Sequence, residues 1–488
     1  MRAVPLIPIV LVAAVAAAPH DAQGQPPPEP RPPSTAPRTG SLQVSQSVQT
    51  FLGGVPTGTA TGDPITITVI DAIRRALDHN LGVLTADEQL GRISGDRWVA
   101  LANLLPNVNA RVTETRQVFN LAAFGFGSSS GGPFAGLPTL VGPFNVFDAR
   151  VFLSQSIFDA NAVHNARAES HNVQSARLLQ QSARDLVIHV AGDLYIQALA
   201  ASASADSARA QQETARALYT QAVDLKTSGM VAGIDVLRAQ VQLETDTQRV
   251  TSTANEFEKT KLQLARVIGL PLGQAFLLDP NLPGLPNPDL PFEQTVERAL
   301  QQRPDYQAAI ERIKAAEATR RAAIGETLPT AQVTADYGAI GLTPAQAQTT
   351  FSVVGALNVP IFQGGRAHGR LLQADADLRQ RKAEADDLRA SIYYEVRTAY
   401  LDLQATQQQL EVATRARDLA AQQLTQARDR FTAGVGNNIE VIQAQESVAL
   451  ASAQFINAQF GFDLAKGALI RGIGASQEVL RQISGGGR

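Results

Sequence analysis

The chain has 488 residues, no cysteine, a net charge of −3 and a charged fraction of 18 %. Its length exceeds a typical single domain, so we expect several domains or one extended body. The lack of cysteine excludes a disulfide framework or a thiolate metal site, and the near-neutral charge balance gives no basic face for nucleic acid.

The first residues are typical of an export signal. Arg2 precedes an apolar run over 6–18 that is too short to span a membrane, and Ala22, Gln23 and Gly24 suit a cleavage site. We therefore expect a signal peptide over 1–24, with an uncleaved anchor as the alternative. Residues 25–61 follow as a proline-rich linker that cannot pack a core.

Two long stretches, 160–226 and 366–431, contain little proline or glycine and many strong helix formers. Each predicts a helix of about 100 Å at 1.5 Å per residue. The narrow apolar stripe along them is also compatible with a simple coiled coil. No later stretch reaches 18 consecutive apolar residues, so we expect no transmembrane helix, and a membrane location would require a closed barrel.

Four shorter segments alternate apolar and polar residues with a period of two, which predicts strands with one apolar and one wet face. We place them at about 107–124, 144–158, 330–340 and 351–362. The pattern fits a membrane barrel and a soluble sheet equally well. Four strands are too few to enclose a wide lumen, so either they form a small soluble sheet or three chains pool twelve strands.

The chain also repeats itself. Residues 195–269 match 400–474 without a gap, with 20 identities in 75 positions, and 67–106 match 290–329. The two offsets differ by 18 residues, and the loop over 125–143 accounts for the surplus. We therefore expect two repeats, 62–270 and 292–474, separated by an inter-repeat segment over 271–291 and followed by a tail over 475–488.

The duplicated order of motifs resembles the TolC family of outer-membrane factors from about residue 62 to 474. The resemblance rests on an entry helix at 70–77 with a partial copy at 296–300, on Leu-Pro at 105–106 and 328–329, and on Ile-Phe at 157–158 and 361–362. The turn motifs at 226–240 and 431–445 are the most specific. Membership implies an α+β membrane protein that forms a homotrimer, with a twelve-stranded barrel in the outer membrane and a long α-helical tunnel in the periplasm.

The same resemblance implies the function and partners. The protein would be a passive exit channel of a tripartite efflux pump or a type I secretion system, working with a periplasmic adaptor protein and an inner-membrane transporter. It would need no cofactor and would not be an enzyme. The alternative is a periplasmic coiled-coil adaptor or scaffold, although such a protein would need one helical hairpin where this chain predicts two.

Candidate site residues fall into three groups. The resemblance places the adaptor-docking turns at Ser228, Gly229, Gly434 and Val435, although both glycines are also typical helix C-caps. It places the pore constriction at Asp235, Glu440 and Gln443, although carboxylates in a first helical turn are also favoured by the helix dipole. Gln443 stands where the family has a second acidic residue, and Gly436 stands where some members have an arginine that helps hold the gate shut. We therefore expect one ring of carboxylates at the constriction and no arginine of that kind.

The third group would face the barrel lumen: Arg111, Asp148, Arg150 and Asp336. The loop over 125–143 would lie outside the cell. The histidines are scattered, and the pair His164 and His171 shares a helix face without making a metal site. We find no phosphate-binding loop and no nucleophile elbow, so energy would come from a partner.

Overall fold

The computed structural model describes residues 50–124, 138–286, 291–433, 435–436 and 438–485. All of its elements lie in one compact unit, Ser45–Arg488. The expected signal peptide, most of the proline-rich linker, loop residues 125–137 and Gly434 lie outside the described residues, as do 287–290 and 486–488.

Two very long helices dominate the fold, as the sequence predicts. Helix α4 spans Ala160–Thr227 and helix α8 spans Arg366–Thr432, with 68 and 67 residues. The side chain of Asp159 caps the start of α4 by accepting a hydrogen bond from the N–H of Ala162 at 3.0 Å. The predicted bounds are correct to within one residue.

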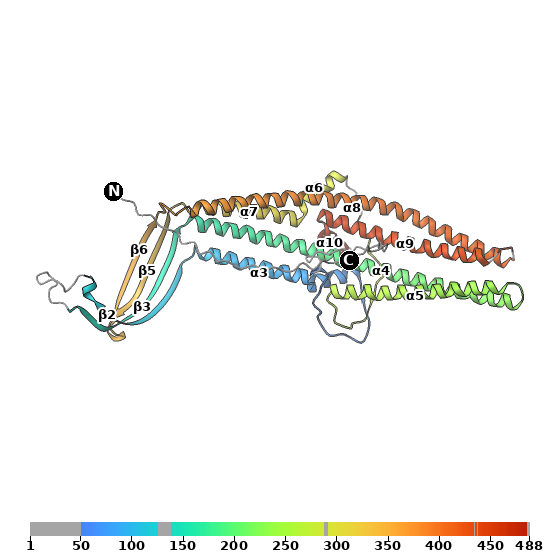
Figure 1. Cartoon of the computed structure of the whole chain (residues 1–488), viewed down its shortest axis with the longest axis horizontal. Coiled ribbons are helices and arrows are strands. Elements are labelled where there is room, and N and C mark those ends of the chain that lie inside the picture. The colour runs from blue at the N-terminus through green and yellow to red at the C-terminus, as the bar shows by residue number, and fades with distance from the viewer. Residues whose placement is uncertain (1–49, 125–137, 287–290, 434, 437, 486–488) are drawn as a thin grey trace, which may run out of the picture. The chain divides into compact units, whose positions relative to one another are not determined.

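Shorter helices flank each long one (Figure 1). Helices α3 (Leu81–Ala102) and α5 (Gly233–Val267) pack against α4, and α7 (Pro304–Gly325) and α9 (Asn438–Ile473) pack against α8. The remaining helices are α2 (Val69–His79), α6 (Phe292–Gln302) and α10 (Ser476–Gly485). The order of elements from α2 to α5 recurs from α6 to α9, which agrees with the predicted duplication.

Helix α4 contains an 18-residue window with a mean hydropathy of 1.4, long and apolar enough to cross a membrane by length and composition alone. The sequence criterion of an unbroken apolar run did not detect it. A core helix has the same composition, and α4 packs against α3, α5, α7 and α9. A third of the window is buried inside the structure, and 20 side chains of α4 are buried along its length.

Four strands form one antiparallel sheet in the order β2-β3-β5-β6. Their bounds are β2 Asn107–Asn120, β3 Leu140–Phe158, β5 Thr330–Gly341 and β6 Gln348–Asn358. A separate parallel pair joins β1 (Ile65–Ile67) to β4 (Phe276–Leu278). Two short 3₁₀ helices, η1 (Leu121–Phe124) and η2 (Pro344–Gln346), adjoin the larger sheet.

The predicted bounds of three strands were wrong. Strand β3 begins four residues before the expected 144, because Pro143 lies at a register shift opposite Val118, where no ladder hydrogen bond is lost. Strand β2 ends at Asn120 because η1 follows. Strand β6 runs over 348–358 and not 351–362, since Pro360 ends the pairing and Ile361 is 96 % exposed beyond it.

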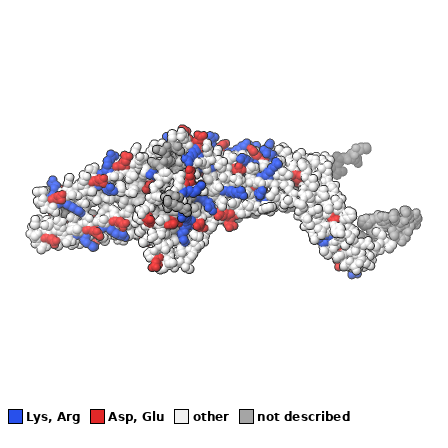
Figure 2. Space-filling model, turned by 180° about the vertical axis from the view of Figure 1, so that it is seen from behind, with Lys and Arg blue, Asp and Glu red and all other residues white. Residues whose placement is uncertain are grey.

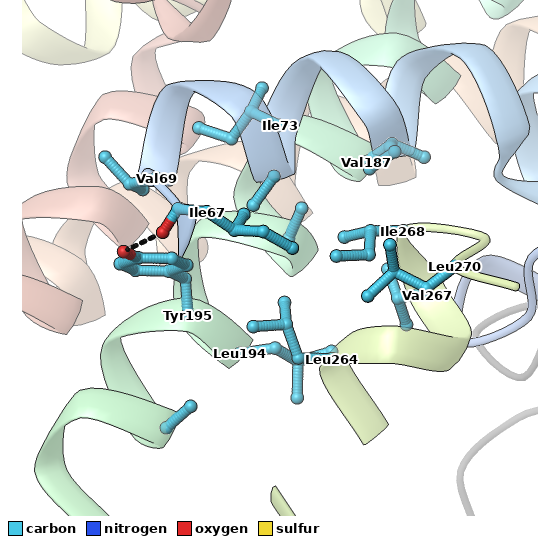
Figure 3. Packing of buried hydrophobic residues seen from close by; sticks show 14 of the residues in the cluster. Ile67, Val69, Ile73, Val187, Leu194, Tyr195, Leu264, Val267, Ile268 and Leu270 are labelled. Carbon is cyan, nitrogen blue, oxygen red and sulfur yellow. Dashed lines mark hydrogen bonds between the residues drawn. The ribbon is translucent and has the colours of Figure 1, made fainter. Parts of the chain in front are cut away.

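The largest apolar cluster joins α2, α4, the end of α5 and the short parallel pair (Figure 3). Tyr195 is fully buried there, and its hydroxyl donates to the carbonyl oxygens of Ile67 and Asp279, each at 2.9 Å. A second cluster joins α6, α8 and α9 around Ile392, Val396 and Leu469. Each repeat therefore fixes its long helix in a core of its own.

Candidate functional site

The four charges predicted to line a lumen lie on one face of the sheet. Arg111 of β2 stands opposite Arg150 of β3, and Phe152 of β3 stands opposite Asp336 of β5. Because alternate residues of a strand share a face, Asp148 lies on the same side as Arg150 and Phe152. We call this side the polar face.

Arg150 holds the polar face together. Its guanidinium donates to both carboxylate oxygens of Asp148, at 2.7 and 2.5 Å, and to Asp336 at 3.1 Å across the strand pair. The guanidinium carbons of Arg111 and Arg150 lie 5.6 and 5.2 Å from the ring centre of Phe152, within the range of a cation–π contact. The structure thus brings all four predicted residues into one cluster.

The opposite side of the sheet, which we call the apolar face, carries large exposed hydrophobic side chains. Val112 is 70 % exposed, Tyr337 64 %, Phe351 77 % and Val353 68 %. In the view of Figure 2, charged side chains cover the helices densely and the strands sparsely. An apolar surface of this extent is normally covered by lipid or another protein.

The sheet has two open edges in the described chain. Strands β2 and β6 each pair on one side only. Long unpaired edges expose backbone hydrogen-bonding groups, and proteins normally cover them. Since all three pairings are antiparallel, β2 and β6 run in opposite directions. A second copy could therefore place its β6 beside β2 and continue the antiparallel alternation.

The turn between α4 and α5 is a Schellman motif. Gly229 has a φ of 74°, its N–H donates to the carbonyl of Lys226, and the N–H of Met230 donates to Leu225. Ser228 is the C-cap, and its hydroxyl donates to the carbonyls of Asp224 and Leu225. Because no atom lies within 4 Å of a Cβ built on Gly229, its conformation alone explains the glycine.

The turn between α8 and α9 ends its helix in a related way. The N–H groups of Val435 and Gly436 both donate to the carbonyl of Arg430 at 3.0 Å, and Val435 is 69 % exposed. Next to this turn, a small hydrophobic cluster packs Val441 and Ala444 of α9 against Phe431 and Leu424 of α8. The predicted turn residues Ser228, Gly229 and Val435 are thus exposed at helix ends.

The three predicted constriction residues lie in the first turns of α5 and α9. Asp235 is 3.2 Å from Arg238, and Glu440 is 3.6 Å from the guanidinium of Arg430 across the turn. Gln443 is exposed one turn after Glu440. Sequence reasoning missed Arg430 as a partner of Glu440, since ten residues and a turn separate them.

An ionic network around the buried Arg303, at the junction of α6 and α7, was also missed. Arg303 is 7 % exposed and contacts Asp305 at 2.7 and 3.1 Å, Glu395 of α8 at 2.7 Å and the carbonyl of Gly472. Arg471 of α9 contacts the second oxygen of Glu395 at 3.1 Å. Burial raises the pKa of Asp305, but the Arg303 guanidinium outweighs it and holds that pKa below its usual range.

A cavity of about 450 Å³ lies between α2, α4, α9, α10 and residues 280–285. On its α4 wall, His189 and Asp193 lie 3.3 Å apart. Burial lowers the pKa of His189 to about 4 and raises the pKa of Asp193 to about 7. The imidazole is therefore neutral at pH 7, and the contact is not an ion pair at that pH.

Within the described residues, no group of three or more His, Asp or Glu side chains could hold a metal ion. His171 contacts Glu311 of α7 at 2.7 Å, so it joins two packed helices. His164 makes no ion pair with any residue that the structure describes, and no described element brings the two histidines to a common ligand.

Comparison with known proteins supports the resemblance. Residues 295–475 match the family described as outer membrane efflux protein. Protein CyaE of Bordetella pertussis is 26 % identical over 303 residues, which cover 60 % of this chain and 64 % of CyaE, less than two thirds of that relative.

Solved structures share the fold. The CmeC outer membrane channel of Campylobacter jejuni aligns with a TM-score of 0.72 at 16 % identity, covering 89 % of this chain and 95 % of that one. The open state of the Neisseria gonorrhoeae MtrE outer membrane channel aligns with a TM-score of 0.69 at 17 % identity, covering 84 % and 89 %.

The fold is that of outer-membrane channels, with long helical hairpins and a four-stranded sheet. The match over residues 295–475 and the shared fold both support the resemblance to the TolC family of outer-membrane factors that the motifs indicated. The expected location in the cell outer membrane agrees with the description of the family that residues 295–475 match.

Proposed function

We propose that three copies of this chain close into a ring and form a passive exit channel across the outer membrane. The observation that carries the proposal is the sheet, which has an exposed apolar face, a charged polar face and two antiparallel open edges. Head-to-tail addition of three copies gives twelve strands with no edge left, an even number within the range of membrane barrels. The apolar face would meet lipid and the polar face water.

The helices would continue the passage into the periplasm. Ser228, Gly229, Gly434 and Val435 would meet the helical hairpin of a periplasmic adaptor, and the adaptor would connect the channel to an inner-membrane transporter. Asp235, Glu440 and Gln443 would line the constriction near these turns. The repeats would span 62–270 and 292–474, with 271–291 and 475–488 belonging to a belt around the tunnel. The passage would serve efflux or type I secretion.

The test combines mass with conductance. Detergent-purified protein is examined by light scattering and then inserted into planar bilayers for single-channel recording. We expect a particle of three chains and discrete openings, with conductance that rises in Glu440→Gln. A monomer that washes off membranes in carbonate and never inserts would contradict the channel and favour the periplasmic scaffold.

A further inference from the structure

We propose that Arg111 sets the charge selectivity of the barrel lumen, because it is the one charge of the polar face that forms no ion pair with a described residue. This inference rests on the proposed channel and names the residue that governs which ions pass through its barrel.

Charged residues are few on the strands of the sheet. The four strands carry six charged residues: Arg111, Glu114, Arg116, Asp148, Arg150 and Asp336. Alternation places Glu114 and Arg116 on the apolar face and leaves four charges on the polar face. Two are positive and two are negative, so the polar face of one chain is electrically balanced.

Three of these four charged side chains pair with one another. Arg150 contacts Asp148 and Asp336 through three hydrogen bonds, and the side chains of these three residues are only 17–26 % exposed. This triad has a net charge of −1. Arg111 supplies the compensating +1, but its cross-strand neighbour is another cation, Arg150. It forms no ion pair within 4 Å with a residue that the structure describes, and its guanidinium lies over the ring of Phe152, 5.6 Å from the ring centre.

A neighbouring copy in the ring supplies no carboxylate next to Arg111. Ring closure places a β6 strand beside β2, and β6 carries no charged residue over Gln348–Asn358. The next strand inward is β5, whose only acid, Asp336, already contacts Arg150. A second copy therefore offers Arg111 no carboxylate from its adjacent strand, and the guanidinium stays available to mobile anions.

The expected effect follows from the balance. Arg111→Gln leaves −1 per chain and three negative charges per ring, so the channel becomes cation-selective. Three unit charges about 10 Å from an ion, in water and screened at 0.1 M salt, change the cation-to-anion permeability ratio about fivefold. Asp336→Asn leaves +1 per chain and shifts the ratio in the opposite direction. The double variant restores the balance and the original ratio.

The experiment measures reversal potentials of single channels in a KCl gradient. It uses the full chain, Arg111→Gln, Asp336→Asn, the double variant and Arg116→Gln. The last is a matched control, because it removes the same charge from the same strand on the apolar face. We expect opposite shifts in the two single variants, recovery in the double variant and no shift in the control.

The outcomes separate this inference from the proposed function. Conducting channels whose ratio is unchanged by Arg111→Gln, or is changed as much by Arg116→Gln, overturn the role of Arg111 and leave the channel intact. Absence of conductance in the unmodified protein overturns the channel itself. If Arg111→Gln does not assemble, as judged by its mass, comparison of the double variant with Asp336→Asn still tests the role of Arg111, because these two variants differ only at residue 111; equal permeability ratios for the two would overturn it.

Discussion

The ionic network around Arg303 makes a sharp prediction about stability. Arg303 is 7 % exposed, and its guanidinium neutralises Asp305 and Glu395 where α6, α7 and α8 meet. Arg303→Met keeps most of the apolar stem but leaves two carboxylates without that partner. Removing one partner of a fully buried ion pair costs about 3–5 kcal/mol. Asp305 and Glu395 are 25 % and 33 % exposed and Glu395 keeps Arg471 at 3.1 Å, so we expect a loss near the lower end, about 3 kcal/mol, that falls mainly on Asp305.

The matched control is Arg298→Met on α6. Arg298 contacts Glu478 at 3.1 Å, but both side chains are well exposed, at 37 % and 50 %. Exposed pairs of this kind contribute about 0–1 kcal/mol. Urea unfolding of detergent-solubilised protein, followed by helical circular dichroism at one protein concentration, gives the free energy of unfolding for each variant.

A third variant tests the stated cause. If uncompensated charge is responsible, Arg303→Met combined with Asp305→Asn loses less free energy of unfolding than the sum of the two single changes. Equal losses for Arg303→Met and Arg298→Met would refute the reasoning, as would strict additivity in the double variant.

Three further predictions use the same unfolding assay. Gly269→Ala lowers the free energy of unfolding by several kcal/mol (on the order of 3), because φ is +62° and a Cβ would lie 2.7 Å from the carbonyl oxygen of Val55. Its control, Gly273→Ala, lowers it by about 1 kcal/mol, because φ is +82° but the surroundings are open. Equal losses would contradict this prediction. Tyr195→Phe loses about 1 kcal/mol through its hydroxyl contacts, and an unchanged free energy would show that these hydrogen bonds contribute nothing. Relative to the unfolded state, folded Asp193 binds an extra proton between pH 4 and 7, which makes the free energy of unfolding fall as pH rises. Folded His189 lacks a proton between pH 4 and 6.5, which makes the free energy of unfolding rise with pH. The two effects cancel between pH 4 and 6.5. Asp193→Asn therefore makes stability rise with pH from 4 to 6.5, and His189→Gln makes it fall from pH 4 to 7; parallel curves for both variants would contradict the assignment.

Helix bounds and strand faces could be predicted from the sequence where a local pattern repeats over many residues. The bounds of α4 and α8 follow from long runs of helix formers without proline. Asp159 and Gly229 flank α4, and Gly365 precedes α8. The polar face followed from strict alternation, since a period of two assigns each side chain to a side. The bounds of β3 did not, because Pro143 is tolerated only through a register shift that depends on the partner strand.

Contacts between distant segments were not predictable from local pattern. Arg303 and Glu395 are 92 residues apart, and no periodicity links the start of α7 with the middle of α8. The contact between Arg430 and Glu440 depends on how the turn folds back. His189 and Asp193 are one helical turn apart and could have been paired from sequence, but their shifted pKa values come from burial by other elements.

Labelling of two neighbouring residues of β6 tests the barrel most directly. Ser352 stands opposite Asp336 on the polar face, and Val353 stands opposite Ala335 on the apolar face, where it is 68 % exposed in the isolated chain. Since the chain has no cysteine of its own, Ser352→Cys and Val353→Cys can each be treated with a water-soluble maleimide in intact outer membranes without background. We predict that the reagent labels Ser352→Cys and not Val353→Cys, because water would reach one face and lipid would cover the other. Equal labelling of both would show that water reaches both faces of the sheet and would contradict a lipid-facing barrel.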